Sequence, residues 1–163
     1  MRLDQLEASL SRINDWIKAV DQKISIALVF EVGVIALVAK LTYDRVIASI
    51  TSINFMTELL ISVTIVLLVA SLLWSVFALK PNTRKSNVSG SLIFFGSIAI
   101  MTLKAFKAKL NKQTSDQYES DLIEQIHINS KIALRKHRLL SQSLMIFLTG
   151  IILWFIAITV VAR

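Results

Sequence analysis

The stretch that decides the fold is Leu59–Leu79, LLISVTIVLLVASLLWSVFAL, which has 21 residues and contains no charge, glycine or proline. At a rise of about 1.5 Å per residue, a helix of this length crosses the ~30 Å hydrocarbon core of a bilayer. Its fourteen Leu, Ile, Val and Phe side chains together favour insertion by about 6 kcal/mol. We expect its three serines and one threonine to bond to carbonyls of their own helix and to change this balance little. The stretch therefore predicts a transmembrane helix.

Composition and two further apolar runs extend this prediction to the whole chain. The 163 residues are 55% hydrophobic and carry a formal net charge of +7. The further runs cover residues 24–41 and 144–162. Cysteine is absent, so the chain has no disulfide framework and no thiolate chemistry. We predict an all-α integral membrane protein with three transmembrane helices and a small, mostly helical cytoplasmic region.

The first span carries a polar residue, Glu31, near its centre. Eleven Ile, Leu, Val and Phe residues of 24–41 supply about −5 kcal/mol, against about +3 kcal/mol for one central acid. An acid in a span usually faces a bundle interior or a water path, which makes it a functional candidate. The alternative is a side chain with a structural role only, either protonated or hydrogen-bonded to a neighbouring helix and so stabilising the packing of the two helices. Gly33 nearby would allow another helix to approach closely.

Residues 1–23 predict an amphipathic helix with an apolar seam. The seam residues follow each other at alternating steps of three and four, and they are Leu3, Leu6, Leu10, Ile13, Ile17, Val20 and Ile24. Such a seam can pair protomers as a coiled coil. It can equally lie on the protein's own soluble part, or in the headgroup layer.

The other segments are a short external connection, 42–58, and one sizeable soluble segment, 80–143. Within the latter, the apolar run 91–103 is too short to span and suggests a buried strand, a tight bend or a re-entrant piece. Thr102 is placed to cap a short helix. Thr114 with Gln117 forms a capping-box signature that opens a long helix. The apolar face of that helix is traced by Tyr118, Leu122, Ile126, Ala133 and Leu140.

The distribution of Lys and Arg predicts the orientation in the membrane. Residues 80–143 hold eleven of these cations, residues 1–23 hold four, and the 42–58 connection holds one. Because cytoplasmic loops carry the excess of Lys and Arg, the N-terminus and the 80–143 segment are expected in the cytoplasm.

The sequence offers little support for an enzyme. It contains no glycine-rich phosphate loop, no HExxH and no Gly-x-Ser-x-Gly motif, and we expect neither a metal site nor a cofactor. The basic excess of 80–143 has two explanations, an anion site such as one for a nucleotide phosphate, or attraction to anionic lipid. No motif of duplex DNA binding accompanies the charge, so we do not expect DNA as a partner.

Several short motifs stand in a recognisable order along the chain. They are Trp16 with Asp21-x-Lys23 before the first span, Phe94-Phe95-Gly96-x-Ile98-Ala99 in the soluble segment, a short helix from Thr102 with Phe106, and Tyr118-x3-Leu122-x2-Gln125-Ile126-x3-Ser130-x-Ile132-x3-Lys136-x2-Leu139 before the last span. In this order they resemble the transmembrane effectors of the Pycsar bacterial anti-phage systems. The resemblance covers nearly the whole chain, although Glu31 stands where a neutral polar residue is expected.

The resemblance implies a multi-pass inner-membrane effector whose cytoplasmic region, 80–143, binds a cyclic pyrimidine mononucleotide, cUMP or cCMP, made by a partner cyclase. Related membrane effectors answer other cyclic nucleotides. Binding would reorganise the spans, impair the membrane and cause growth arrest or abortive infection.

We expect the ligand phosphate to be neutralised by Arg135, Lys136 or Arg138. Trp16, Asp21 and Lys23 would couple the seam to the first span, and the protein is expected to form a homo-oligomer. The alternative is a constitutive membrane scaffold or accessory subunit that assembles through the seam and needs no small ligand.

Overall fold

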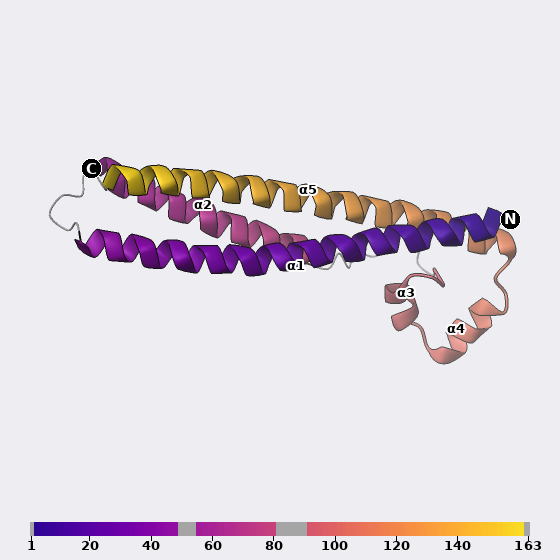
Figure 1. Cartoon of the computed structure of the whole chain (residues 1–163). Helices are drawn as coiled ribbons and strands as arrows, with labels where there is room; N and C mark the ends of the chain where they lie inside the picture. Colours follow the sequence, from indigo (N-terminus) through magenta and orange to yellow (C-terminus); the bar gives the residue numbers. More distant parts are fainter. Residues whose placement is uncertain (1, 49–54, 81–90, 162–163) are drawn as a thin grey trace. The chain divides into compact units, whose positions relative to one another are not determined.

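The computed structural model describes residues 2–48, 55–80 and 91–161. In this part of the chain it contains five helices and no strand (Figure 1): α1 (Arg2–Ala48), α2 (Phe55–Leu79), α3 (Phe95–Ala99), α4 (Leu103–Leu110) and α5 (Ser115–Val161). The prediction of an all-α fold is confirmed. The strand alternative for residues 91–103 is wrong, because the backbone there bends and then forms the short helix α3.

The chain divides into two compact units. Unit 1 comprises Met1–Val20 and Pro81–Arg135, and unit 2 comprises Asp21–Lys80 and Lys136–Arg163. Both long helices, α1 and α5, contribute residues to each unit. We describe each unit by itself.

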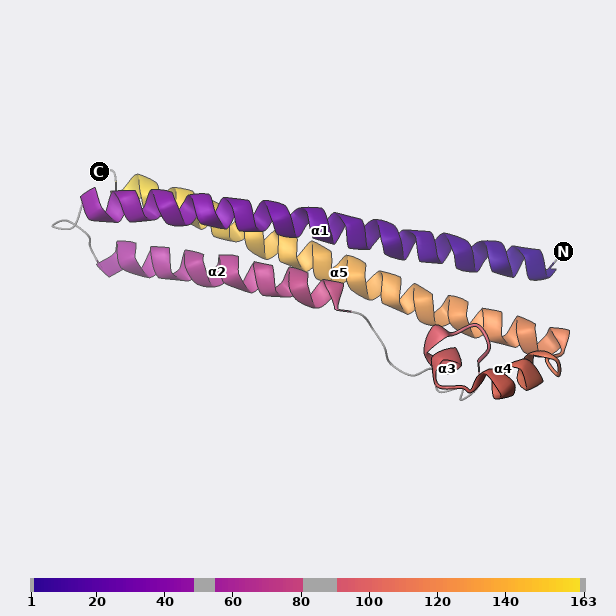
Figure 2. The same cartoon turned by 90° about the horizontal axis from the view of Figure 1, so that it is seen from below.

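Unit 2 contains α2 together with parts of α1 and α5, and the three helices lie side by side in both ribbon views (Figures 1 and 2). Each of the three helices is long and apolar enough to cross a membrane, which confirms the prediction of three transmembrane helices. Their shared core holds Val38, Leu68, Phe147 and Trp154. Residues of the apolar runs that face away from this core are exposed, for example Ile26 and Val29.

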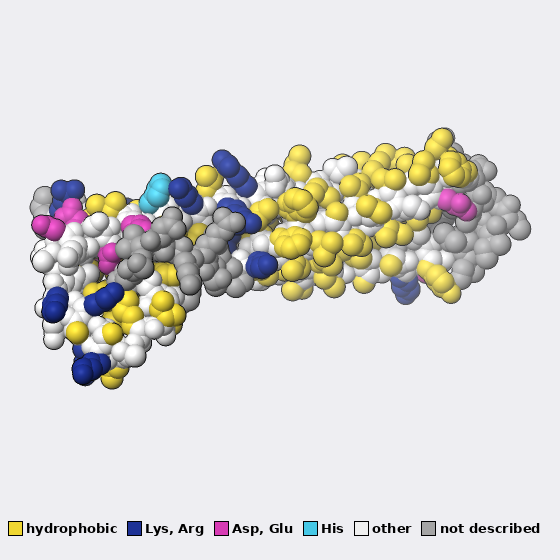
Figure 3. All heavy atoms as spheres, turned by 180° about the vertical axis from the view of Figure 1, so that it is seen from behind, with side chains coloured by type: hydrophobic (Ala, Val, Ile, Leu, Met, Phe, Trp, Pro, Cys, Tyr) yellow, Lys and Arg dark blue, Asp and Glu magenta, His cyan; other side chains and the backbone are white. Residues whose placement is uncertain are grey.

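The distribution of polarity in unit 2 is the reverse of that in a water-soluble bundle. Hydrophobic side chains cover the surface of the long helices here, as Figure 3 shows. The polar residues buried in this unit are Glu31, Thr57, Thr64, Ser71, Ser75, Lys136 and Ser143. This pattern fits a lipid-facing exterior, because polar groups in a membrane must find partners inside the protein.

One glycine decides how closely two helices of unit 2 approach. A Cβ on Gly150 of α5 would lie 3.1 Å from Leu68 Cδ2 and 3.4 Å from Leu67 Cβ, both on α2. A Cβ on Gly33 would meet nothing within 4 Å. The prediction that Gly33 permits close helix approach is therefore wrong, and Gly150 has that role instead.

Unit 1 is built on the first part of α5, against which the N-terminal part of α1 is bonded. Tyr118 donates a hydrogen bond of 2.7 Å to Glu7, and Asn129 donates one of 2.8 Å to Asn14. Arg2 forms a 2.8 Å ion pair with Glu119.

The seam residues of α1 in unit 1 are buried or half-buried. In unit 1 these residues pack within the same chain, which is one of the arrangements expected for the seam.

Local signals in unit 1 behave as the sequence predicts. The Thr102 hydroxyl accepts from the Ala105 amide and caps α4. Thr114 and Gln117 form the reciprocal capping box at the start of α5, at 3.2 and 3.3 Å. Before α3, the buried hydroxyl of Ser91 accepts from two backbone amides.

Candidate functional site

An ion pair joins α1 to α5 just before both helices enter their apolar runs. The Lys136 ammonium contacts the Asp21 carboxylate, and both residues belong to unit 2. The Lys136 side chain is only 10% exposed, whereas that of Asp21 is 37% exposed. The pair is 115 residues apart in sequence, so it is a tertiary link between two helices that also pack in the bundle.

Lys136 is less exposed than Arg135 and Arg138, the two other cations that we expected to neutralise the ligand phosphate. Arg135 and Arg138 are exposed, and residues three apart on a helix share a face. Lys136 lies on the buried side of α5 and already has an acidic partner. Two exposed cations can therefore meet a dissolved anion directly, while Lys136 can do so only by leaving Asp21.

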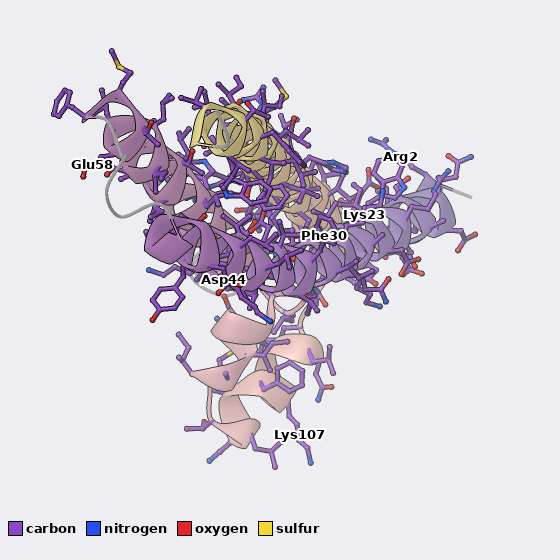
Figure 4. The ribbon with its side chains drawn as sticks, turned by 60° about the vertical axis from the view of Figure 1, so that its left-hand side comes forward. Arg2, Lys23, Phe30, Asp44, Glu58 and Lys107 are labelled. Atoms are coloured by element: carbon purple, nitrogen blue, oxygen red, sulfur yellow. The ribbon has the colours of Figure 1, made fainter. Side chains whose placement is uncertain are left out.

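The family-motif residues Trp16, Lys23 and Gly96 lie in different environments. Trp16 is 64% exposed and Lys23, labelled in Figure 4, is also exposed. Gly96 leaves room for a neighbouring ring, because a Cβ there would lie 2.6 Å from Phe94 Cε1. Phe95 begins α3, and its side chain lies outside the described part of the structure.

Gln125 is 4% exposed, and among the described residues its amide nitrogen has no hydrogen-bond partner. A buried donor without an acceptor costs free energy, so this amide is available to a ligand that brings an acceptor.

In unit 1 the surroundings of Tyr118 change the pKa of its phenol. Its hydrogen bond to Glu7 raises the pKa of the phenol above its ordinary value of 10.0. Burial and the charge of Glu7 act in the same direction. The bond thus requires a protonated phenol, and it ties α5 to the N-terminal helix.

Glu31 lies in the interior of unit 2, within a cluster of hydroxyl groups. It is fully buried, and its Oε1 atom accepts from Ser71 at 3.0 Å, Ser75 at 3.2 Å and Ser143 at 3.0 Å. These serines come from α2 and α5. The expectation that the hydroxyls of 59–79 bond within their own helix is wrong for Ser71 and Ser75, which bond across to other helices. It is also wrong for Thr64, whose hydroxyl has no partner among the described residues.

Sequence reasoning identified Glu31 but missed its partners. A signal was present, because Glu31 lies seven residues after Ile24 and so continues the seam of α1 into the span. Thr57, Thr64 and Ser71 likewise follow each other at steps of seven on α2 and are all buried. Within the described ranges, no group of three or more His, Cys, Asp or Glu is placed to hold a metal ion.

Comparison with known proteins assigns the family. No curated protein and no solved structure matches the chain significantly. A family model, the Pycsar effector protein domain, matches residues 5–163 and so covers nearly the whole chain, in agreement with the resemblance noted from the motifs. The chain belongs to the Pycsar effector family, whose members are transmembrane effectors of anti-phage defence.

Proposed function

We propose that the cytoplasmic segment of this effector binds a cyclic nucleotide, with cUMP or cCMP favoured, and that binding impairs the bacterial inner membrane. A partner cyclase would make the signal, and the outcome would be growth arrest or abortive infection. The protein would act without catalysing a reaction, as a homo-oligomer with its N-terminus in the cytoplasm. Support comes from the family and from the three membrane-crossing helices. The cation excess of residues 80–143 supports the orientation.

The observation that carries the proposal is the ion pair between Lys136 and Asp21. Its position before the spans makes it a latch between α1 and α5. A cyclic mononucleotide carries one negatively charged phosphate, which would compete with the Asp21 carboxylate for Lys136.

In this scheme the exposed Arg135 and Arg138 would attract the phosphate first. Transfer of Lys136 from Asp21 to the phosphate would then release α1 from α5. We call the state with the Lys136–Asp21 pair intact closed and the state with α1 released from α5 open. A ligand shifts the equilibrium between two states only by binding one of them more tightly than the other. The phosphate would bind Lys136 more tightly in the open state, where Asp21 no longer occupies it.

Other family-motif residues would support coupling. Gln125 lies eleven residues before Lys136 on α5, about 16 Å along the helix, so it would act in coupling and not in contact with the same phosphate. Trp16 and Lys23 would couple the N-terminal helix to the first span. The alternative, a constitutive scaffold or accessory subunit that assembles through the seam, predicts no response to any nucleotide.

The test is the thermal stability of the detergent-purified protein with a panel of cyclic mono-, di- and oligonucleotides. A ligand at 100 times its dissociation constant adds about 2.7 kcal/mol, which raises the melting temperature visibly. We expect a shift with cUMP or cCMP, and its loss in the Arg135→Ala, Arg138→Ala variant. The matched control removes two exposed cations of α4, Lys107 and Lys109 (Lys107 is labelled in Figure 4), and should keep the shift.

A shift with a cyclic dinucleotide alone would retain the effector mechanism and reject the pyrimidine ligand. The absence of a shift with every nucleotide, in a sample shown to be folded, would reject ligand binding and favour the scaffold.

A further inference from the structure

Among the described residues, no Lys, Arg or His forms an ion pair with Glu31. Along α1 the nearest charged residues are Lys23 and Lys40, about two turns away on either side. The facing part of α2 has no charged residue between Glu58 and Lys80, and α5 has none after Arg138 within the described residues. An isolated ionised carboxylate in such surroundings is very costly unless a cation accompanies it.

The hydroxyl groups around Glu31 supply too few hydrogens to replace a cation. Three hydroxyls provide three hydrogens, and two of them are shared with backbone carbonyls. Ser143 Oγ lies 2.9 Å from the Ser71 carbonyl oxygen, and Ser71 Oγ lies 3.2 Å from that of Ser143. Ser75 Oγ and Ser143 Oγ are themselves 2.7 Å apart. All these oxygens compete for the same three hydrogens.

The second oxygen of the Glu31 carboxyl group provides a further observation. Glu31 Oε2 and Thr64 Oγ1 have no hydrogen-bond partner among the described residues, and both residues are almost fully buried. Native proteins rarely leave such atoms unpaired, and a bound ion is one of the explanations for the exceptions. Glu31 Oε2 belongs to the same carboxyl group that lacks a counter-charge.

We propose that Glu31, Ser71, Ser75 and Ser143 form a binding site for a monovalent cation at the centre of the transmembrane bundle, occupied by a proton in the resting protein. The separations of 2.7–3.2 Å between the cluster oxygens are hydrogen-bond lengths, which favours a proton over a larger ion between them. The bound proton is a fourth hydrogen beside those of the three hydroxyl groups. It neutralises the Glu31 carboxylate and adds one hydrogen-bond donor to the cluster.

The first test is infrared spectroscopy of the full chain in vesicles of ether lipids, which carry no ester carbonyl, at neutral pH in a choline buffer free of alkali cations. We expect a carbonyl-stretch band of a protonated carboxylic acid, which Glu31→Gln removes completely and Glu58→Gln leaves intact. Glu58 is the matched control because it is exposed at the start of α2 (Figure 4). Ser75→Ala should shift the band to higher frequency, because the carboxyl group loses a donor.

Adding Na⁺ or K⁺ distinguishes the occupants. A band that persists identifies a site for protons, and a band that disappears identifies a site that also takes alkali cations. If the band of the protonated carboxyl group is absent in the choline buffer, Glu31 is ionised without a bound proton or alkali cation, and the proposal is overturned. This test uses no nucleotide, so it succeeds or fails independently of the proposed function.

A second test rests on the proposed function. If α1, α2 and α5 separate on activation, Glu31 becomes the charged group that faces the opening, so the leak evoked by cUMP or cCMP should favour cations over anions. In vesicles with a salt gradient, Glu31→Gln should reduce this preference and Glu58→Gln should not. A leak with equal cation preference in all three proteins would contradict the assignment. If no leak occurs, the proposed function fails and the infrared result alone decides the cation site.

Discussion

The ion pair between Lys136 and Asp21 gives the sharpest prediction, because each partner can be neutralised without a large change in volume. Lys136→Met keeps most of the apolar stem and removes the charge. Removing one partner of a fully buried pair costs about 3–5 kcal/mol. Asp21 is 37% exposed and can be rehydrated, so we expect about 2 kcal/mol for Lys136→Met. Asp21→Asn should cost more, since it strands the less exposed charge.

If the pair holds the closed state, this free energy moves the equilibrium between closed and open states. A change of about 2 kcal/mol corresponds to roughly a 30-fold higher population of the open state. Both single variants should therefore depolarise cells that lack a cyclase. The double variant Asp21→Lys with Lys136→Asp restores the attraction with reversed signs and should return the cells to normal.

The assay is a membrane-potential dye in cells without a cyclase, with membrane insertion measured in the same samples. The ion pair between Lys18 and Asp15 is the matched control. It spans 3.7 Å on the surface of α1, and both side chains are more than 60% exposed. Breaking it with Lys18→Met should have no effect. The proposed role of the ion pair would be refuted if the single variants insert normally and leave the membrane potential unchanged. It would also be refuted if the charge swap fails to restore the membrane potential.

Two further predictions concern packing and pH. Gly150→Leu should displace α2 from α5 and lower the melting temperature, because even a methyl group at this position would lie 3.1 Å from Leu68. The control Gly33→Leu should leave the melting temperature unchanged, since a Cβ there meets nothing within 4 Å. Equal melting temperatures of the two variants would contradict the packing role of Gly150. Tyr118→Phe should cost about 1 kcal/mol through loss of the bond to Glu7. Because the pKa of Tyr118 is raised in the folded protein, the stabilisation is complete below pH 10.0 and is lost as the pH rises through the raised value. The difference in melting temperature between wild type and Tyr118→Phe should therefore shrink at high pH, and a constant difference would show that the phenol proton is not involved.

The local features of this chain could be predicted from its sequence because each depends on nearby residues. Leu59–Leu79 is a membrane helix by length and apolar composition alone. The Thr114–Gln117 capping box requires two residues three apart on one turn. The order of short motifs was sufficient to indicate the family, which the match over residues 5–163 confirms.

The candidate sites depended on the tertiary structure. Asp21 and Lys136 were both identified, but as separate residues with different roles, and their pairing joins positions 115 residues apart. Glu31 was noticed, but its serine partners on α2 and α5 were not. The physical reason is that local sequence fixes which residues share a face of a helix, while the rotation and axial register of packed helices decide which faces meet. Gly150 and Gly33 illustrate the same point, since only the packed bundle distinguishes the glycine that faces a neighbouring helix from the one that does not.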